Sequence, residues 1–160
     1  MDNIIKECAS YIICHREQKK GQYINHSNNI KSQYVIYSNL DEYVTNNKNK
    51  RFSELLFLLI EKTGKTDIEL YKNAGIDRRL ISKIRSNDDY NPSKNTILAV
   101  VIALELNKKE ADELLLSAGY SLSRSDDYDL AISFFIEKGI YDFYQINNIL
   151  YQMGFDVFDI

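Results

Sequence analysis

The sequence predicts an all-α protein from about residue 51 onward, and three observations predict it. Apolar residues recur at helical spacing through seven successive stretches, with a single proline, Pro92, in 160 residues. Five of the six glycines each follow such a stretch, where a left-handed residue commonly ends a helix. Several stretches begin with a Ser, Thr, Asn or Asp that can cap a helix. The predicted helices are 52–63, 66–74, 77–86, 93–105, 107–118, 125–138 and 141–153.

Residues 1–50 are expected to form an irregular N-terminal extension. A first helix is predicted at about Asn3–Ile13, and an Asn, Lys and Ser-rich stretch follows at 15–32. The segment QYVIYS at 33–38 is consistent with one short strand, and 39–50 with a short helix that leads into a polar linker. We expect this extension to dock on the helical part, to mediate self-association or to contact a partner.

Capping patterns support the boundaries of the later helices. Thr66 with Glu69, and Asn107 with Glu110, have the spacing of a capping box. In the helix at 93–105, apolar residues surround nearly the whole circumference. We therefore expect this helix to be the central buried element of the fold.

Two of the predicted helices, 66–74 and 77–86, are joined by a short turn that contains Gly75. Five apolar side chains fall where two such helices pack together, namely Leu70, Ala74, Ile76, Ile81 and Ile84. The second helix then exposes Arg78, Arg79, Ser82, Lys83 and Ser86, while Asp77 is expected to be its cap. A basic second helix after a glycine-containing turn is typical of a helix-turn-helix unit.

Together with its neighbours, this unit resembles the lambda-repressor-like helix-turn-helix domains of the Cro/XRE family, over about residues 52–118. The resemblance includes TDIELYKNAGIDRRLISKIR at 66–85, NPS at 91–93 and TILAVVIALELNKKEADELLLSAGY at 96–120. It implies a five-helix core within a DNA-binding domain at 51–120, followed by a C-terminal helical extension at 121–160 that adds two helices. The chain departs from the family pattern at Tyr71, where a small residue is usual, and at Asp88 and Asp89 in the loop that runs beside DNA.

The resemblance implies two sets of contacts with double-stranded DNA. Base edges in the major groove would be contacted by Arg78, Arg79, Ser82 and Lys83. Phosphates would be contacted by Lys65, Thr66, Arg85, Asn87, Tyr90, Asn91, Ser93 and Lys94. The implied function is a sequence-specific transcriptional regulator of bacterial or phage type. The alternatives are RNA binding, or an interaction module or adaptor with this fold, for example in a phage-defence system, that does not read DNA.

The distribution of charge permits nucleic-acid binding although the net charge is −3. Residues 1–50 carry seven Lys and Arg against five Asp and Glu, residues 51–100 nine against seven, and residues 101–160 four against eleven. The net charges of the three segments are therefore +2, +2 and −7, so the negative charge is concentrated in the last third of the chain.

The last predicted helix carries an apolar stripe of Phe143, Ile146, Leu150 and Met153. This stripe either packs on the helical domain or forms a dimer surface, because small domains of the resembled kind bind DNA as two-fold pairs. We expect a homodimer, with 1–50 or 125–160 as the surface for any protein partner.

The sequence offers no pattern for other classes of protein. The longest apolar run, at 55–60, is too short to cross a membrane, and the N-terminus lacks the features of a signal peptide, so a cytoplasmic protein is expected. Cys8, Cys14, His15 and His26 match no common zinc spacing, and no metal or cofactor is expected. No catalytic arrangement of side chains is visible, so we do not expect an enzyme.

Overall fold

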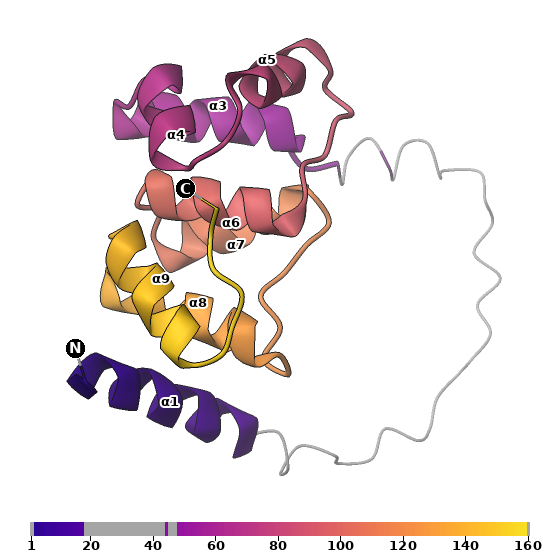
Figure 1. Cartoon of the computed structure of the whole chain (residues 1–160). Coiled ribbons are helices and arrows are strands. Elements are labelled where there is room, and N and C mark those ends of the chain that lie inside the picture. Colours follow the sequence, from indigo (N-terminus) through magenta and orange to yellow (C-terminus); the bar gives the residue numbers. More distant parts are fainter. Residues whose placement is uncertain (1, 18–43, 45–47, 160) are drawn as a thin grey trace, which may run out of the picture.

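The computed structural model describes residues 2–17, 44 and 48–159, and the regular secondary structure in these residues is entirely helical (Figure 1). The helices are α1 Asp2–Glu17, α3 Phe52–Thr63, α4 Asp67–Asn73, α5 Arg78–Ser86, α6 Lys94–Ala103, α7 Lys108–Ser117, α8 Asp127–Lys138 and α9 Phe143–Gln152. The all-α prediction is confirmed for this part of the chain, and each of the seven helices predicted after residue 51 is present.

Local signals set the ends of these helices as predicted. All five glycines expected at helix ends have positive φ, between 62° and 78°. Both capping boxes are formed, because Thr66 exchanges hydrogen bonds with Glu69 and Asn107 exchanges them with Glu110. A hydrogen bond from the Thr66 backbone amide, together with one from the Thr66 hydroxyl, holds the pKa of the Glu69 carboxyl below its usual value, so this glutamate remains an acceptor at neutral pH.

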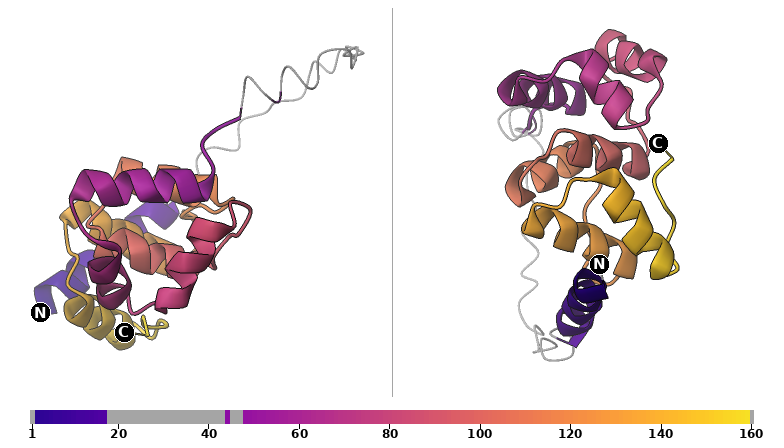
Figure 2. Two further views of the ribbon diagram at one scale, coloured as in Figure 1. Left: turned by 90° about the horizontal axis from the view of Figure 1, so that it is seen from above. Right: turned by 60° about the vertical axis from the view of Figure 1, so that its left-hand side comes forward.

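The helices are arranged in successive layers (Figures 1 and 2). α3, α4 and α5 form one end of the molecule, α6 and α7 the middle, and α8 and α9 the next layer, with α1 at the opposite end. α3 contacts α7, α4 contacts both α5 and α6, and α8 contacts both α7 and α1. A single apolar core runs through all of these layers.

α6 lies at the centre of this core, as its all-round apolar character predicts. Every residue from Ile97 to Leu104 is buried. A helix without a polar face is stable only when other elements cover it on every side. The layer of α3, α4 and α5 is therefore held against one side of α6 through α4, and α7 covers another side.

A buried ion pair links α6 to the layer below it. The Lys94 ammonium donates to both carboxylate oxygens of Asp129, at 2.7 and 2.6 Å, and the Ser123 amide donates to the same carboxylate at 2.7 Å. The Asp129 side chain is only 4% exposed. A buried carboxylate is strongly destabilising when its charge has no partner, so this ion pair fixes the start of α6 against α8.

The first helix is longer than predicted and docks on α8. The prediction that it ends at Ile13 is wrong, because Arg16 and Glu17 favour helix and no glycine or proline precedes Gly21. The Tyr11 hydroxyl donates to Glu137 at 2.8 Å, and its ring meets Phe134 edge-on at 5.5 Å between centroids.

On the same face of α1, Cys8 is fully buried in the apolar core. Burial raises the pKa of the Cys8 thiol to about 11, so the thiol is protonated at neutral pH. The predicted strand at 33–38 lies outside the described residues. Of the predicted helix and linker at 39–50, only residues 44 and 48–50 are described.

The apolar stripe of α9 packs inside the chain. Ile146 and Leu150 are fully buried, and Phe143 meets Phe158 of the C-terminal segment edge-on at 5.5 Å. The Asn147 side chain holds the same segment, because it both donates to the Phe158 carbonyl and accepts from the Phe158 amide at 2.9 Å. Of the two roles considered for this stripe, the structure places it in the intramolecular one.

The Lys94–Asp129 pair gives a prediction about stability. Asp129→Ala is expected to lower the free energy of unfolding by about 3 kcal/mol, because it leaves the Lys94 ammonium and the Ser123 amide without their buried acceptor. Asp112→Ala is the matched control, since its pair with Lys108 is exposed and contributes less than about 1 kcal/mol. Urea unfolding of both variants measures the difference, and equal losses would contradict a structural role for the buried pair.

Candidate nucleic-acid interface

The turn between α4 and α5 is closed by backbone and cap hydrogen bonds. Gly75 has φ 62°, a left-handed conformation that glycine adopts without steric cost. The Ile76 amide donates to the Tyr71 carbonyl at 3.0 Å. Asp77 is the N-cap of α5, as predicted, and its carboxylate accepts from the Arg79 amide at 2.7 Å. These bonds fix where α5 begins relative to α4.

The inner faces of α4 and α5 hold the side chains that the sequence predicted. Leu70, Ala74, Ile81 and Ile84 are buried, and Ile76 is partly buried against the same core. Tyr71 also packs partly buried against this core, so the pair of helices accommodates a large side chain at that position.

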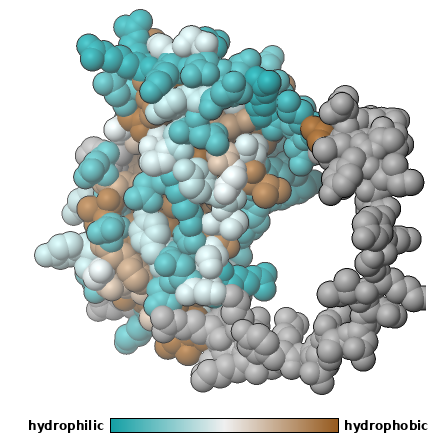
Figure 3. All heavy atoms as spheres, turned by 90° about the vertical axis from the view of Figure 1, so that its right-hand side faces the viewer, coloured by the Kyte–Doolittle hydropathy of each residue, from teal (hydrophilic) through white to brown (hydrophobic). Residues whose placement is uncertain are grey.

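The outer face of α5 is exposed and polar. Its predicted exposed residues, Arg78, Arg79, Ser82, Lys83 and Ser86, are all exposed. Figure 3 shows a largely hydrophilic surface over the upper part of the molecule, where the layer of α3, α4 and α5 lies. Four cations and one acid occur in 77–86, so this helix is locally basic.

The four predicted base-contacting residues share this face and differ in how tightly they are held. Among the described residues, the guanidinium groups of Arg78 and Arg79 have no ion pair or hydrogen bond. The Lys83 ammonium lies 4.0 Å from the centre of the Tyr90 ring, and the Ser82 hydroxyl donates to the Arg78 carbonyl at 3.4 Å. The two arginines are therefore available to an external ligand.

Arg85 is attached to the other two helices of its layer. Its guanidinium donates to the Asp67 carboxylate at 2.5 Å and lies 4.2 Å from the centre of the Phe57 ring. The Arg85 side chain is still 58% exposed. It lies at the edge of the basic face and also connects α5 to α3 and α4.

Two other predicted phosphate ligands are lysines with internal partners. Lys65 donates to the Ala103 carbonyl at 2.7 Å and to Glu105 at 2.8 Å, at the end of α6. Lys94 is bound to Asp129. The structure does not bring these two ammonium groups together with the exposed face of α5.

The remaining predicted phosphate ligands have local structural contacts. Thr66 and Ser93 are the N-caps of α4 and α6. The Asn91 side chain donates to the Ala118 carbonyl at 3.1 Å, and the Asn87 side chain accepts from the Asp89 amide at 3.1 Å. These groups shape the loop between α5 and α6, and Tyr90 lies under Lys83.

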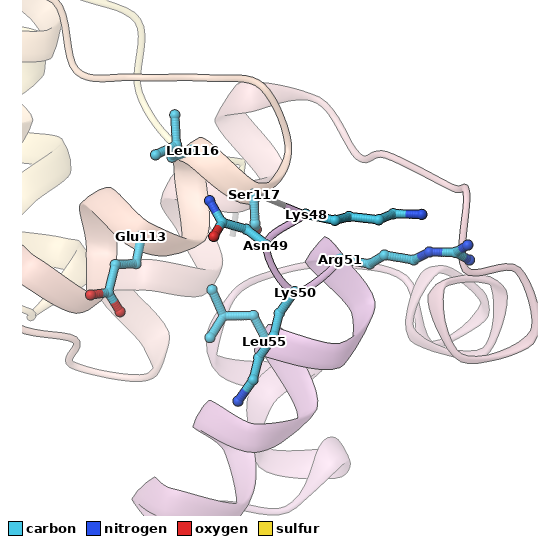
Figure 4. Close-up of a pocket in the computed structure, with 8 residues that line it drawn as sticks. All are labelled: Lys48, Asn49, Lys50, Arg51, Leu55, Glu113, Leu116 and Ser117. Atoms are coloured by element: carbon cyan, nitrogen blue, oxygen red, sulfur yellow. The ribbon is translucent and has the colours of Figure 1, made fainter. Parts of the chain in front are cut away.

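Sequence reasoning missed cations that lie beside this loop. The Arg51 guanidinium is 3.6 Å from both Asp88 and Asp89, the two acids that depart from the family pattern. Figure 4 shows the Lys48 and Arg51 side chains extending in the same direction from the segment before α3. Lys48 and Lys50 are exposed.

This segment also borders a hollow of about 640 Å³ between α3 and α7. The hollow is lined by Lys48, Asn49, Lys50, Arg51, Leu55, Glu113, Leu116 and Ser117 (Figure 4). Three cations in four residues are the sequence signal that could have identified this segment, although the same residues also suit a polar linker.

Comparison of the chain with protein-family models, with curated proteins and with solved structures found no match. Within the described residues, no group of three or more His, Cys, Asp or Glu side chains could hold a metal ion, and no described helix has the length and apolarity to cross a membrane. The fold and the site thus define an all-α protein with a basic, exposed helix α5.

The different attachments of the cations give a prediction about stability. Arg85→Ala is expected to lower the free energy of unfolding by about 1 kcal/mol, because it removes a partly exposed ion pair and a cation–π contact. Arg78→Ala and Arg79→Ala are expected to change it by less than about 0.5 kcal/mol, since neither guanidinium has a partner in the part of the chain that the structure describes. Thermal unfolding of the three variants measures these changes. A large loss of stability in Arg79→Ala would show that the exposed face has a structural role.

Proposed function

We propose that the protein is a sequence-specific DNA-binding transcriptional regulator of bacterial or phage type. In this proposal α4, the turn and α5 form a helix-turn-helix within a Cro/XRE-like domain at 51–120. The observation that carries the proposal is the outer face of α5, where Arg78, Arg79, Ser82 and Lys83 are exposed together and neither arginine has a partner among the described residues. α5 enters the major groove with this face toward the bases.

The chemistry of these side chains suits the edges of base pairs. An arginine guanidinium donates two parallel hydrogen bonds to O6 and N7 of guanine, and a lysine ammonium or serine hydroxyl adds a single bond. Arg78 and Arg79, near the start of α5, provide the base-specific contacts. Ser82 and Lys83, one turn further along, contact either a base edge or a phosphate.

Phosphate contacts come from the cations at the edges of this face. Arg85 keeps part of its guanidinium exposed beside Asp67. On the other side of the loop, Arg51 offsets part of the charge of Asp88 and Asp89, and Lys48 extends in the same direction as Arg51. Such cations displace the counterions of DNA, which is the main source of affinity that does not depend on sequence.

The alternative function is an interaction module or adaptor that recognises a protein and does not read DNA. One observation favours it. Most of the predicted phosphate ligands, including Lys65, Thr66, Asn91, Ser93 and Lys94, already have contacts inside the molecule. DNA binding at low salt separates the two functions.

Lys83→Ala tests the electrostatic part of the proposal. The variant is expected to bind random-sequence duplex DNA more weakly. The negative slope of log affinity against log salt concentration should become shallower by about 0.9, as expected for the loss of one phosphate contact. Lys109→Ala is the matched control, because this exposed lysine lies on α7 in the middle layer. Fluorescence anisotropy over a range of salt concentrations measures both, and equal behaviour of the two variants would argue against Lys83 as a contact.

Arg78→Ala and Arg79→Ala test the reading of sequence. At one base position, each substitution is expected to reduce the difference in binding free energy between the preferred base and the others by about 1–3 kcal/mol. The affinity for random DNA should remain largely unchanged. Selection from a duplex library by wild type and variants measures the preference. Absence of any DNA binding at low salt by the folded wild-type protein would refute the proposed function.

A further inference from the structure

The hollow of about 640 Å³ between α3 and α7 lies where the layer that contains α5 meets the middle layer (Figures 1 and 4). Its walls come from two parts of the chain, the segment before α3 with the start of that helix, and the second half of α7. Sites for small molecules commonly have volumes of about 300–1,000 Å³. The hollow therefore has the size of a small-molecule site.

Two leucines form the apolar wall of the hollow. Leu55 on α3 is partly buried, and Leu116 on α7 is 65% exposed. Leu114 and Leu115 of α7 are fully buried, so this helix is held in the core without Leu116. An apolar group that covers Leu55 and Leu116 removes their surface from water, which is favourable. The hollow therefore suits a ligand with an apolar part.

The charged side chains around the hollow favour an anion. Lys48, Lys50 and Arg51 contribute three positive charges and Glu113 contributes one negative charge, so the lining has a net charge of +2. Three of these four side chains come from one short segment, which places the positive charge on one side of the hollow. An anionic group on the ligand is attracted to that side.

The fold already uses some of these charges. Arg51 lies 3.6 Å from two acids of the loop before α6, and Glu113 lies 3.9 Å from Lys109 on its own helix. Lys48 and Lys50 are exposed and have no ion pair with another described residue. Figure 4 shows the Lys50 side chain extending in a different direction from Lys48 and Arg51. The two lysines are therefore the charges that a ligand can use.

The polar and apolar parts of the lining are separate. Asn49 lies between the two lysines and is exposed, so its side-chain amide adds a neutral donor to two charged ones. A carboxylate is bound most strongly by charged donors. On the opposite wall the Ser117 hydroxyl already donates to the Leu114 carbonyl at 2.7 Å. An anionic group therefore finds its donors in the segment 48–50, and an apolar group finds its contacts at the leucines.

We propose that this hollow binds a small molecule with an anionic head and an apolar body, of which a medium-chain carboxylate is the simplest example. The head lies at Lys48, Asn49 and Lys50, and the body covers Leu55 and Leu116. The proposal does not depend on DNA binding by α5.

Other anionic ligands match the hollow less well. A DNA backbone offers phosphates to the lysines but little apolar surface to the two leucines. An extended acidic peptide needs a groove that receives successive side chains, whereas the lining here consists of eight residues from two neighbouring elements. One compact ligand satisfies both the lysines and the leucines.

Titrations of the full chain followed by two-dimensional amide NMR test the site with four probes, octanoate, octylammonium, 1-octanol and acetate. Octanoate is expected to shift the amides of 48–51, 55 and 113–117, with a dissociation constant of roughly 1 mM for so few atoms. 1-Octanol lacks the charge and acetate lacks the apolar body, so each should bind at least about threefold more weakly. Octylammonium carries the wrong charge and should bind at least about fivefold more weakly.

Three variants assign the roles of the side chains. Lys50→Glu should weaken octanoate binding at least about fivefold and strengthen octylammonium binding, because the charge at the head position is reversed. Leu116→Ser should weaken octanoate binding at least about threefold, because it removes apolar surface. Lys72→Glu is the matched control, since this exposed lysine of α4 does not line the hollow, and it should leave octanoate binding unchanged.

Each contrary outcome overturns the proposal. No shift of these amides by octanoate up to about 20 mM would remove the site. Acetate binding as well as octanoate would show that the lysines are only a solvated charged surface. An acidic pentapeptide with a central leucine that binds here at least about tenfold more tightly than octanoate would assign the hollow to a protein partner. The amide spectra verify that the variants are folded, and no DNA is present, so failure of the proposed DNA binding leaves this result unchanged.

Discussion

The rest of the structure depends on the burial of α6 on all sides. Residues 97–103 of this helix are all buried, so other helices must cover each of its faces. α4 and α7 pack on it directly, and Lys94 at its start is bound to Asp129 of α8. The position of α5 follows from this, because α5 packs on α4 through Ile81 and Ile84.

This arrangement separates the cations of the middle of the chain into two groups. Lys65 and Lys94 neutralise acids at the two ends of α6 and contribute to the fold. Arg78, Arg79 and Lys83 lie on the outside of α5, in a layer away from the acidic α8. The Lys83 ammonium lies over the Tyr90 ring, and the two guanidinium groups have no partner among the described residues. A protein of net negative charge can in this way present a locally basic helix, which is the basis of the proposed DNA-binding function.

Features set by local sequence were predictable, and features set by distant contacts were not. The helix boundaries follow from glycines and capping residues within a few positions, and the burial of α6 follows from its own composition. The partners of Lys65 and Lys94 are 40 and 35 residues away, so no local pattern could show that these lysines are engaged. The docking of α1 on α8 and the pairing of Arg51 with Asp88 depend on tertiary contacts in the same way. On α9 the apolar stripe was recognised, but only the structure shows that it is used within the chain and that two tyrosines remain outside.

The central claim is that the exposed face of α5 is the surface that meets DNA. Mapping backbone amide chemical shifts during titration with duplex DNA at low salt tests this claim most directly, because it locates the contact without any substitution. The largest changes are expected at Arg78–Ser86 and in the adjoining loop, with smaller changes at residues 48–51. Changes confined to α8, α9 or α1, or no change at all, would contradict it.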